Sequence, residues 1–200
     1  MVFVKICGLR ETEHVDAALD AGADAIGLVL TASPRFVTAA TARGLVDRVG
    51  GRALTVGVFR GESVDEIERL SADSGVDCIQ LHGNYDSNDV GRLADLGIPL
   101  IRAVSFTSPS DDLGADMLLV DAPRAGSGEV WDYATMAGRS LSGRWLLAGG
   151  LTPGNVTSAI AAASPWGVDV SSGVETSPGH KDAALIREFL AAAKRPGSPL

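Results

Sequence analysis

The sequence predicts an α/β protein, a single compact (β/α)8 barrel of the TIM type that spans residues 1–200. Short apolar, β-branched runs alternate with segments of helical period from one end of the chain to the other, which is typical of βα units around a parallel sheet. Eight such units can be counted, and eight units in one domain favour closure into a barrel. At roughly 25 residues per unit, the barrel would lie near the lower size limit for this architecture.

An open, doubly wound sheet is the alternative architecture for alternating strands and helices. The first predicted βα turn, Cys7-Gly8-Leu9-Arg10, lacks the GxGxxG pattern that binds a dinucleotide in that fold. We therefore expect the closed barrel.

The expected strands are short, apolar and rich in β-branched residues. They are Val2–Cys7, Ala25–Leu30, Leu54–Phe59, Cys78–His82, Leu100–Ser105, Met117–Asp121, Trp145–Ala148 and Val168–Ser171. The expected helices are Glu13–Ala21, Ala39–Val49, Val64–Ser74, Asp86–Leu96, a short or missing turn near Pro109–Leu113, Tyr133–Gly138, Pro153–Ala163 and Ala183–Ala193.

Capping signals support several of these helices. Ser63 precedes Val64 and is followed three residues later by Glu66, and Pro153 stands where a helix could begin. Glycines follow the expected helix ends at positions 22, 75 and 97. The tail, residues 194–200, contains two prolines and a glycine, and we expect it to fray.

Composition narrows the class of partner. A hydrophobic content of 46% with 21% charged residues is enough for one buried core. The net charge of −8 and a pI near 4.8 argue against a nucleic-acid partner or an anionic membrane, because phosphate surfaces select for clustered Lys and Arg. A small anionic ligand remains compatible with this charge, and no feature of the sequence sets an oligomeric state.

The two cysteines, Cys7 and Cys78, are too few for a disulfide framework and show no zinc-ligand spacing. The chain begins directly with the apolar run Val2–Ile6, without a signal-peptide pattern, and no apolar run approaches the roughly 18 residues of a membrane span. We expect a reducing, cytoplasmic location.

Polar side chains stand at the ends of four expected strands, where a barrel places its active site. They are Cys7, His82, Asp121 and Ser171. Since alternate residues of a strand share a face, Lys5 points the same way as Cys7, and Gln80 the same way as His82.

A thiol and a carboxylic acid, each at the end of a short apolar strand, could serve as the base and the acid of an isomerase if the fold brings those strand ends together. We expect Cys7 and Asp121 to form this pair, and Lys5 to lower the pKa of Cys7. The plainer interpretations are a buried, structural cysteine, which we keep for Cys78, and a turn carboxylate before Pro123 for Asp121. For His82, a hydrogen-bonded structural histidine is as plausible as a catalytic one.

Two glycine-containing segments follow the last two expected strands, Leu147–Asn155 and Asp169–Glu175. Glycines let backbone N–H groups approach an anion, and barrels commonly hold a phosphate on the loops after strands seven and eight. The alternative is that the glycines only make tight turns. Arg35, in the loop after strand two, has a planar fork that suits a carboxylate, with a solvated surface arginine as the alternative.

Taken together, these segments resemble phosphoribosylanthranilate isomerase, a family of tryptophan biosynthesis. The resemblance spans the chain, and its two ends carry most of the specificity. The motifs occur in order as Lys5–Leu9, Ser33–Val37, Val56–Phe59, Ile79–Gly83, Val120–Asp121, Ala148–Leu151 and Asp169–Glu175.

The resemblance implies an Amadori rearrangement of N-(5-phosphoribosyl)anthranilate to the 1-deoxyribulose 5-phosphate derivative, without metal or cofactor. It implies that Asp121 is the general acid on the furanose ring oxygen and that Cys7 removes the proton from the adjacent sugar carbon. Arg35 would hold the anthranilate carboxylate. The residues implied for the phosphate are Gly150, Ser172 and Gly173, with Asp169 as a ribose contact.

The chain departs from the family after strand six, where Glu129 stands at a position at which lysine is common. This difference concerns loop closure and substrate affinity more than chemistry. Two other functions stay open. A related aldose-ketose isomerase of histidine biosynthesis, or dual activity, would use an aspartate where this chain has Cys7, and a non-catalytic phosphosugar-binding barrel would not need Cys7 and Asp121.

Overall fold

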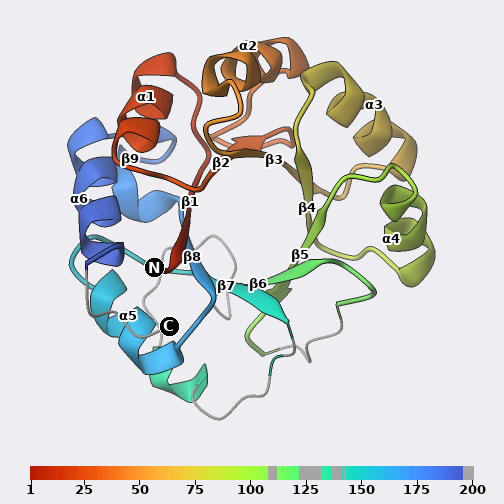
Figure 1. Cartoon of the computed structure of the whole chain (residues 1–200). Coiled ribbons are helices and arrows are strands. Elements are labelled where there is room, and N and C mark those ends of the chain that lie inside the picture. Colours follow the sequence, from red (N-terminus) through yellow and green to blue (C-terminus); the bar gives the residue numbers. More distant parts are fainter. Residues whose placement is uncertain (108–111, 122–131, 137–140, 142, 196–200) are drawn as a thin grey trace.

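The structure, a computed structural model, describes residues 1–107, 112–121, 132–136, 141 and 143–195 (Figure 1). Eight parallel strands pair in sequence order, and β1 also pairs with β8, so the sheet closes into a barrel. This confirms the predicted (β/α)8 architecture. The strands are β1 (Phe3–Cys7), β2 (Ala25–Val29), β3 (Leu54–Arg60), β4 (Cys78–His82), β5 (Leu100–Ser105), β6 (Met117–Asp121), β7 (Arg144–Leu147) and β8 (Gly167–Val170).

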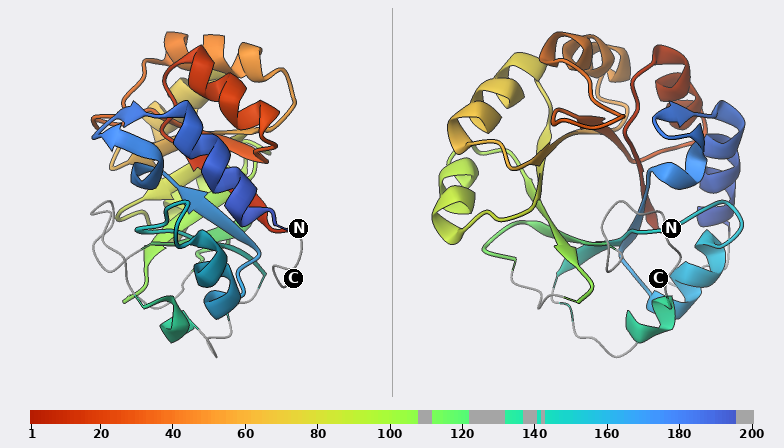
Figure 2. Two further views of the ribbon diagram at one scale, coloured as in Figure 1. Left: turned by 90° about the vertical axis from the view of Figure 1, so that its left-hand side faces the viewer. Right: turned by 180° about the vertical axis from the view of Figure 1, so that it is seen from behind.

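The helices form a ring outside the barrel, as seen along its axis from both ends (Figures 1 and 2). They are α1 (Thr12–Asp20), α2 (Ala39–Val49), α3 (Val64–Ser74), α4 (Ser87–Ala94), α5 (Val156–Ala163) and α6 (Ala183–Ala193). Between β6 and β7 the described residues include the 3-10 turn η1 (Tyr133–Met136), which coincides with the first part of the expected helix Tyr133–Gly138, and residues 137–138 of that helix lie outside the described residues.

Most element boundaries agree with the sequence to within one or two residues, and the local capping chemistry explains why. The Ser63 hydroxyl accepts a hydrogen bond from the Glu66 N–H at the start of α3, and Gly75 ends that helix in the left-handed conformation at φ 68°. A residue with a Cβ disfavours that backbone conformation, whereas glycine adopts it freely.

The expected start of the helix after β7 is wrong. α5 begins at Val156 and not at Pro153, because the preceding residues are held in a turn. The Asn155 side chain accepts a hydrogen bond from the Thr152 N–H and donates one to the Gly150 carbonyl. These contacts tie the segment to the β7 loop and delay the helix.

Alternating residues face the inside of the barrel and give it a layered core. One apolar cluster is formed by Ala25, Val56, Cys78, Ile101, Leu119, Leu146 and Ala148. A smaller cluster, formed by Cys7, Val29 and Val58, lies nearer the carboxyl ends of the strands. The residues of the opposite phase pack outward against the helices in the largest cluster. The inward phase therefore carries the strand side chains of the site.

A hairpin that the sequence did not predict follows β8. The chain makes a 3-10 turn, η2 (Ser172–Val174), and then the antiparallel strands β9 (Glu175–Ser177) and β10 (His180–Lys181) before α6. In the left view of Figure 2 this hairpin, in light blue, lies at the opposite edge of the molecule from the N-terminus. It is thus at the end of the barrel where the strands finish.

Within the part of the chain that the structure describes, no helix has the length and apolar character needed to cross a membrane. Lys194 forms an ion pair with Asp24, with 2.9 Å between Nζ and Oδ2. Residues 196–200 of the expected frayed tail and Glu129 lie outside the described residues.

Candidate active site

A cavity of about 320 Å³ opens at the carboxyl ends of the barrel strands. This is the end at which (β/α)8 enzymes build their active sites. Nine of the eleven residues that the sequence nominates line its wall: Cys7, Arg35, Gln80, His82, Asp121, Gly150, Asp169, Ser171 and Ser172. Of the other two, Lys5 is buried beneath the cavity and bonded to Asp169, and Gly173 follows Ser172 in the η2 turn.

Cys7 is the last residue of β1 and is 7% exposed. Gly27 lies beside it on β2, and a Cβ at that position would be 2.8 Å from the Cys7 sulfur and 3.1 Å from the Lys5 Nζ. The first separation is too short for a Cβ contact and the second is tighter than usual, so the glycine at position 27 lets both side chains take these positions. Sequence analysis missed Gly27, although a glycine inside an apolar strand is a signal of close approach.

Lys5 is fully buried and forms an ion pair with Asp169, with 2.8 Å between Nζ and Oδ1. Burial alone would lower the pKa of Lys5, but the charge of Asp169, the thiolate form of Cys7 and the hydrogen bond to Asp169 outweigh burial and raise that pKa. Lys5 therefore remains charged directly below Cys7.

The expectation that Lys5 lowers the pKa of Cys7 is wrong as to the net direction. Burial raises the pKa of the Cys7 thiol, and the nearby Asp169 charge raises it as well, while Lys5 and Lys181 oppose both effects without overcoming them. A thiolate loses its hydration when buried, and this cost exceeds the attraction of the two cations. The thiol form is thus favoured at neutral pH.

Asp121 ends β6 and is partly exposed on the cavity wall. Its backbone carbonyl accepts a hydrogen bond from the Phe106 N–H, which fixes the end of the strand against the residue that follows β5. Since Cys7 and Asp121 line the same cavity from β1 and β6, the barrel brings the expected base and acid to one space.

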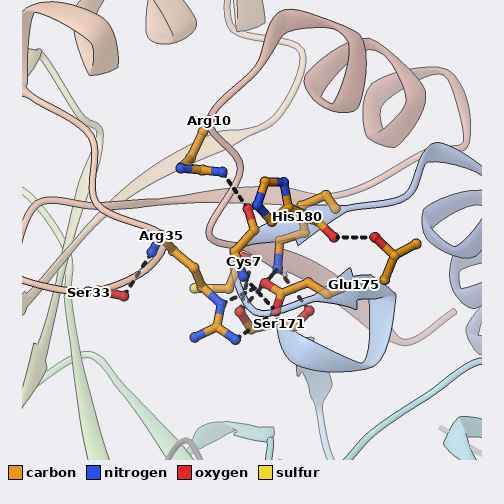
Figure 3. Close-up of polar contacts among 10 residues, drawn as sticks. Cys7, Arg10, Ser33, Arg35, Ser171, Glu175 and His180 are labelled. Atoms are coloured by element: carbon orange, nitrogen blue, oxygen red, sulfur yellow. Dashed lines mark hydrogen bonds and ion pairs between the residues drawn. The ribbon is translucent and has the colours of Figure 1, made fainter.

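Arg35 leaves the loop after β2 and its guanidinium meets the carboxylate of Glu175 beside Cys7 (Figure 3). Two parallel hydrogen bonds join them, 2.7 Å from Nε to Oε1 and 2.8 Å from Nη2 to Oε2. The alternative of a solvated surface arginine is therefore wrong. A Cβ at Gly8 would be 2.7 Å from the Arg35 Cδ, so the glycine after Cys7 also makes room for this arginine.

The two glycine loops pack against each other. A Cβ at Gly173, in the β8 loop, would be 1.8 Å from the carbonyl oxygen of Leu151, in the β7 loop. In the β7 loop, Gly149 and Gly150 have φ values of 85° and 67°. The Tyr133 hydroxyl donates a hydrogen bond of 2.8 Å to the Gly149 carbonyl. These glycines therefore do more than make turns, because they let two backbone segments meet at the cavity.

His82 and Gln80 line the opposite part of the wall, and their side-chain nitrogens lie 2.5 Å apart. The pKa of His82 is lowered to about 4, mainly because the imidazole is buried and also because Lys5 is positively charged. The imidazole is therefore neutral at pH 7 and is suited to a hydrogen-bonding role with Gln80.

Sequence analysis missed several polar residues at the site, among them Thr31 and Arg60 on the cavity wall and Lys181 beside it. Lys181 is buried in β10, and its Nζ donates to the Ser171 carbonyl at 2.8 Å and to the Glu175 Oε1 at 2.7 Å. The signal available in the sequence was a lysine close to the Asp169–Glu175 motif. The hairpin that turns it toward the site could not be recognised from spacing.

The fold and the site define a class of protein, a (β/α)8 barrel with a thiol, a carboxylic acid and two glycine loops around one cavity at the carboxyl ends of its strands. Comparison with known proteins shows which family within this class the chain belongs to. Residues 4–192 match the family described as N-(5'phosphoribosyl)anthranilate (PRA) isomerase. The chain belongs to this family.

Relatives match over nearly their whole length. The N-(5'-phosphoribosyl)anthranilate isomerase of Streptococcus mutans is 40% identical over 98% of this chain and 100% of its own. The crystal structure of TrpF from Jonesia denitrificans is 44% identical, with a TM-score of 0.89 over 97% of each chain. A phosphoribosyl anthranilate isomerase in complex with reduced 1-(o-carboxyphenylamino)-1-deoxyribulose 5-phosphate is 32% identical, with a TM-score of 0.83 over 97% of this chain and 99% of the other.

Proposed function

We propose that this chain converts N-(5'-phosphoribosyl)anthranilate to 1-(2-carboxyphenylamino)-1-deoxyribulose 5-phosphate by general acid–base catalysis. The observation that carries the proposal is that Cys7 and Asp121, from opposite parts of the sequence, line the same cavity as the two glycine loops. A relative of the same family binds a reduced form of this product, which supports the same substrate class here.

In the first step, Asp121 gives its proton to the furanose ring oxygen. The bond from this oxygen to the anomeric carbon breaks as the anthranilate nitrogen shares its electron pair with that carbon, and a protonated Schiff base forms. Cys7 then takes the proton from the neighbouring sugar carbon, which gives an enolamine. The enolamine tautomerises to the amino ketone, so that no atom is gained or lost overall.

The raised pKa of Cys7 is compatible with this role. A base with a higher pKa removes a carbon-bound proton more effectively once it is ionised, although less of it is ionised at neutral pH. The positive charges of Lys5 and Lys181 oppose the effect of burial and support the ionised fraction.

The positions of the remaining residues indicate which group of the substrate each of them would bind. Arg35 would hold the anthranilate carboxylate, and the backbone at Gly150, Ser172 and Gly173 would hold the phosphate. Asp169 would contact the ribose through Oδ2, because its Oδ1 accepts the hydrogen bond from Lys5.

We also propose a cytoplasmic location and a small phosphosugar as the ligand. Both cysteines are buried as free thiols, which suits a reducing compartment.

Turnover of freshly generated phosphoribosylanthranilate, followed by the loss of its fluorescence, tests the function. We expect rapid turnover by the wild type and losses on the order of 10²–10⁴ in kcat for Cys7→Ser and for Asp121→Asn. Cys78→Ala is the matched control, because Cys78 is buried in the inner apolar cluster away from the cavity wall. An inactive wild type would contradict the proposal, and the histidine-pathway substrate would then be assayed.

A further inference from the structure

Glu175 is the last residue of the Asp169–Glu175 motif, and the proposed mechanism gives it no role. Its side chain is 3% exposed and accepts four hydrogen bonds, two from Arg35, one from Lys181 and one from the Gly179 N–H. Both carboxylate oxygens are therefore fully used within the protein, and Glu175 is not available to bind a substrate.

The contact with Glu175 uses one edge of the Arg35 guanidinium. Nε and Nη2 point at the carboxylate oxygens, so the edge formed by Nη1 and the second Nη2 hydrogen remains for another group. No other partner of Arg35 among the described residues uses that edge, and Arg35 lines the cavity. A planar fork held on one edge presents its other edge in a fixed direction.

Lys181 extends the cluster to the catalytic cysteine. Its Nζ donates to Glu175 Oε1, and to the carbonyl and hydroxyl of Ser171. The Ser171 hydroxyl in turn donates to the Cys7 carbonyl at 3.2 Å. Figure 3 shows Arg35, Glu175 and Ser171 gathered around Cys7, so one carboxylate connects the loop after β2 to the loop after β8.

The charges of this cluster do not cancel. Glu175 carries one negative charge and contacts two cations, Arg35 and Lys181, both of which are largely buried. A buried excess of positive charge is costly unless an anion compensates it. The cluster is therefore suited to a substrate that brings a negative charge to the edge of Arg35 that Glu175 leaves unused.

We propose that Glu175 is a positioning residue, which holds Arg35 by its Nε edge so that the Nη1 edge meets the anthranilate carboxylate. Because the single negative charge of Glu175 is shared between Arg35 and Lys181, one positive charge remains for that carboxylate. This inference rests on the proposed function. It assigns to Glu175 the selection of a carboxylated aromatic amine over an uncharged one, although Glu175 itself never contacts the substrate.

Calorimetric binding of two ligands tests the inference. The first is reduced 1-(o-carboxyphenylamino)-1-deoxyribulose 5-phosphate, and the second is the same compound without the carboxyl group. For Glu175→Gln we expect the affinity for the first ligand to fall roughly tenfold, because a misplaced guanidinium loses a charge-assisted bond, with little change for the second. Glu188→Gln, on the exposed face of α6, removes a carboxylate elsewhere and is expected to change neither affinity.

Equal losses for both ligands would show a merely structural role and overturn the inference, and so would unchanged or tighter binding of the first ligand. If Glu175→Gln does not fold, the double variant Glu175→Gln/Lys181→Gln restores the charge balance, and the same selective loss is expected from it. Wild-type turnover is measured in parallel. An inactive wild type would contradict the proposed function, whereas an active wild type with an unselective Glu175→Gln would contradict only this inference.

Discussion

Lys5 and Asp169 form a buried ion pair across the seam at which the barrel closes. They are register partners on β1 and β8, the first and last strands, and their charged atoms are 2.8 Å apart. The Lys5 side chain is fully buried, and that of Asp169 is 10% exposed on the cavity side. The pair therefore joins the two strands that close the barrel and lies at the bottom of the cavity.

Removing one partner of this pair is expected to destabilise the fold strongly. Lys5→Met leaves Asp169 without its buried counter-ion, and we expect the free energy of unfolding to fall by about 3–5 kcal/mol. Urea unfolding measures the change. Lys194→Met is the control, because its pair with Asp24 is partly solvated, with side chains 21% and 35% exposed, and a loss below about 1 kcal/mol is expected. Equal losses of unfolding free energy in Lys5→Met and Lys194→Met would contradict the conclusion that the buried Lys5–Asp169 pair stabilises the fold more than a surface pair does.

The thiol of Cys7 is expected to ionise above the ordinary range of a free cysteine. Since burial raises its pKa, reaction with a thiol reagent in a Cys78→Ala background should accelerate with pH, with a midpoint above the ordinary value. Lys181→Met removes an opposing cation and should move the midpoint higher. A midpoint at or below the value of a free thiol would contradict burial as the dominant cause.

Glu175 is expected to contribute to acid unfolding. Burial alone would raise its pKa, but hydrogen bonds and charges from Arg35 and Lys181 lower it from 4.5 to about 2. The folded state then binds fewer protons than the unfolded state between these values, so the stabilisation is fully present above pH 4.5 and is lost as the pH falls toward 2. Unfolding free energies at pH 6 and pH 3 should therefore differ more in the wild type than in Glu175→Gln. A pH dependence that is the same in both proteins would rule this contribution out.

The sequence predicted the parts of the structure that are determined locally. The helix Val64–Ser74 follows from its own cap residues, Ser63 and Gly75, which bond within the same segment. The position of Cys7 at the cavity follows from the period of two along a strand, together with the rule that strand ends form the site.

Residues that depend on distant partners could not be placed from the sequence. The role of Glu175 depends on Arg35, which is 140 residues away, and on a hairpin that spacing did not reveal. The start of α5 depends on the bond of Asn155 to the Gly150 carbonyl. The pKa of Cys7 depends on how deeply the thiol is buried, and the proximity of Lys5 in sequence gave the opposite sign.

Gly27 lies in close contact with Cys7 and Lys5, and replacing it tests whether this crowding, and not the loss of any glycine, lowers stability. In Gly27→Ala, the new methyl group would overlap the Cys7 sulfur and crowd the Lys5 Nζ. We expect a loss of about 1–3 kcal/mol in the free energy of unfolding, since overpacking forces side chains from their preferred positions. Because Cys7 must move, kcat should fall as well.

Gly44→Ala is the matched substitution. Gly44 lies within α2, and a Cβ there would meet nothing within 4 Å. Alanine in an open helical position should raise the free energy of unfolding by roughly 0.5–1 kcal/mol and leave kcat unchanged. Urea unfolding and the fluorescence assay, applied to both variants, check the pair. If Gly27→Ala, like Gly44→Ala, gave no loss in the free energy of unfolding or in kcat, Cys7 would have room to shift within the barrel. The position of Cys7 would then not depend on a glycine at position 27.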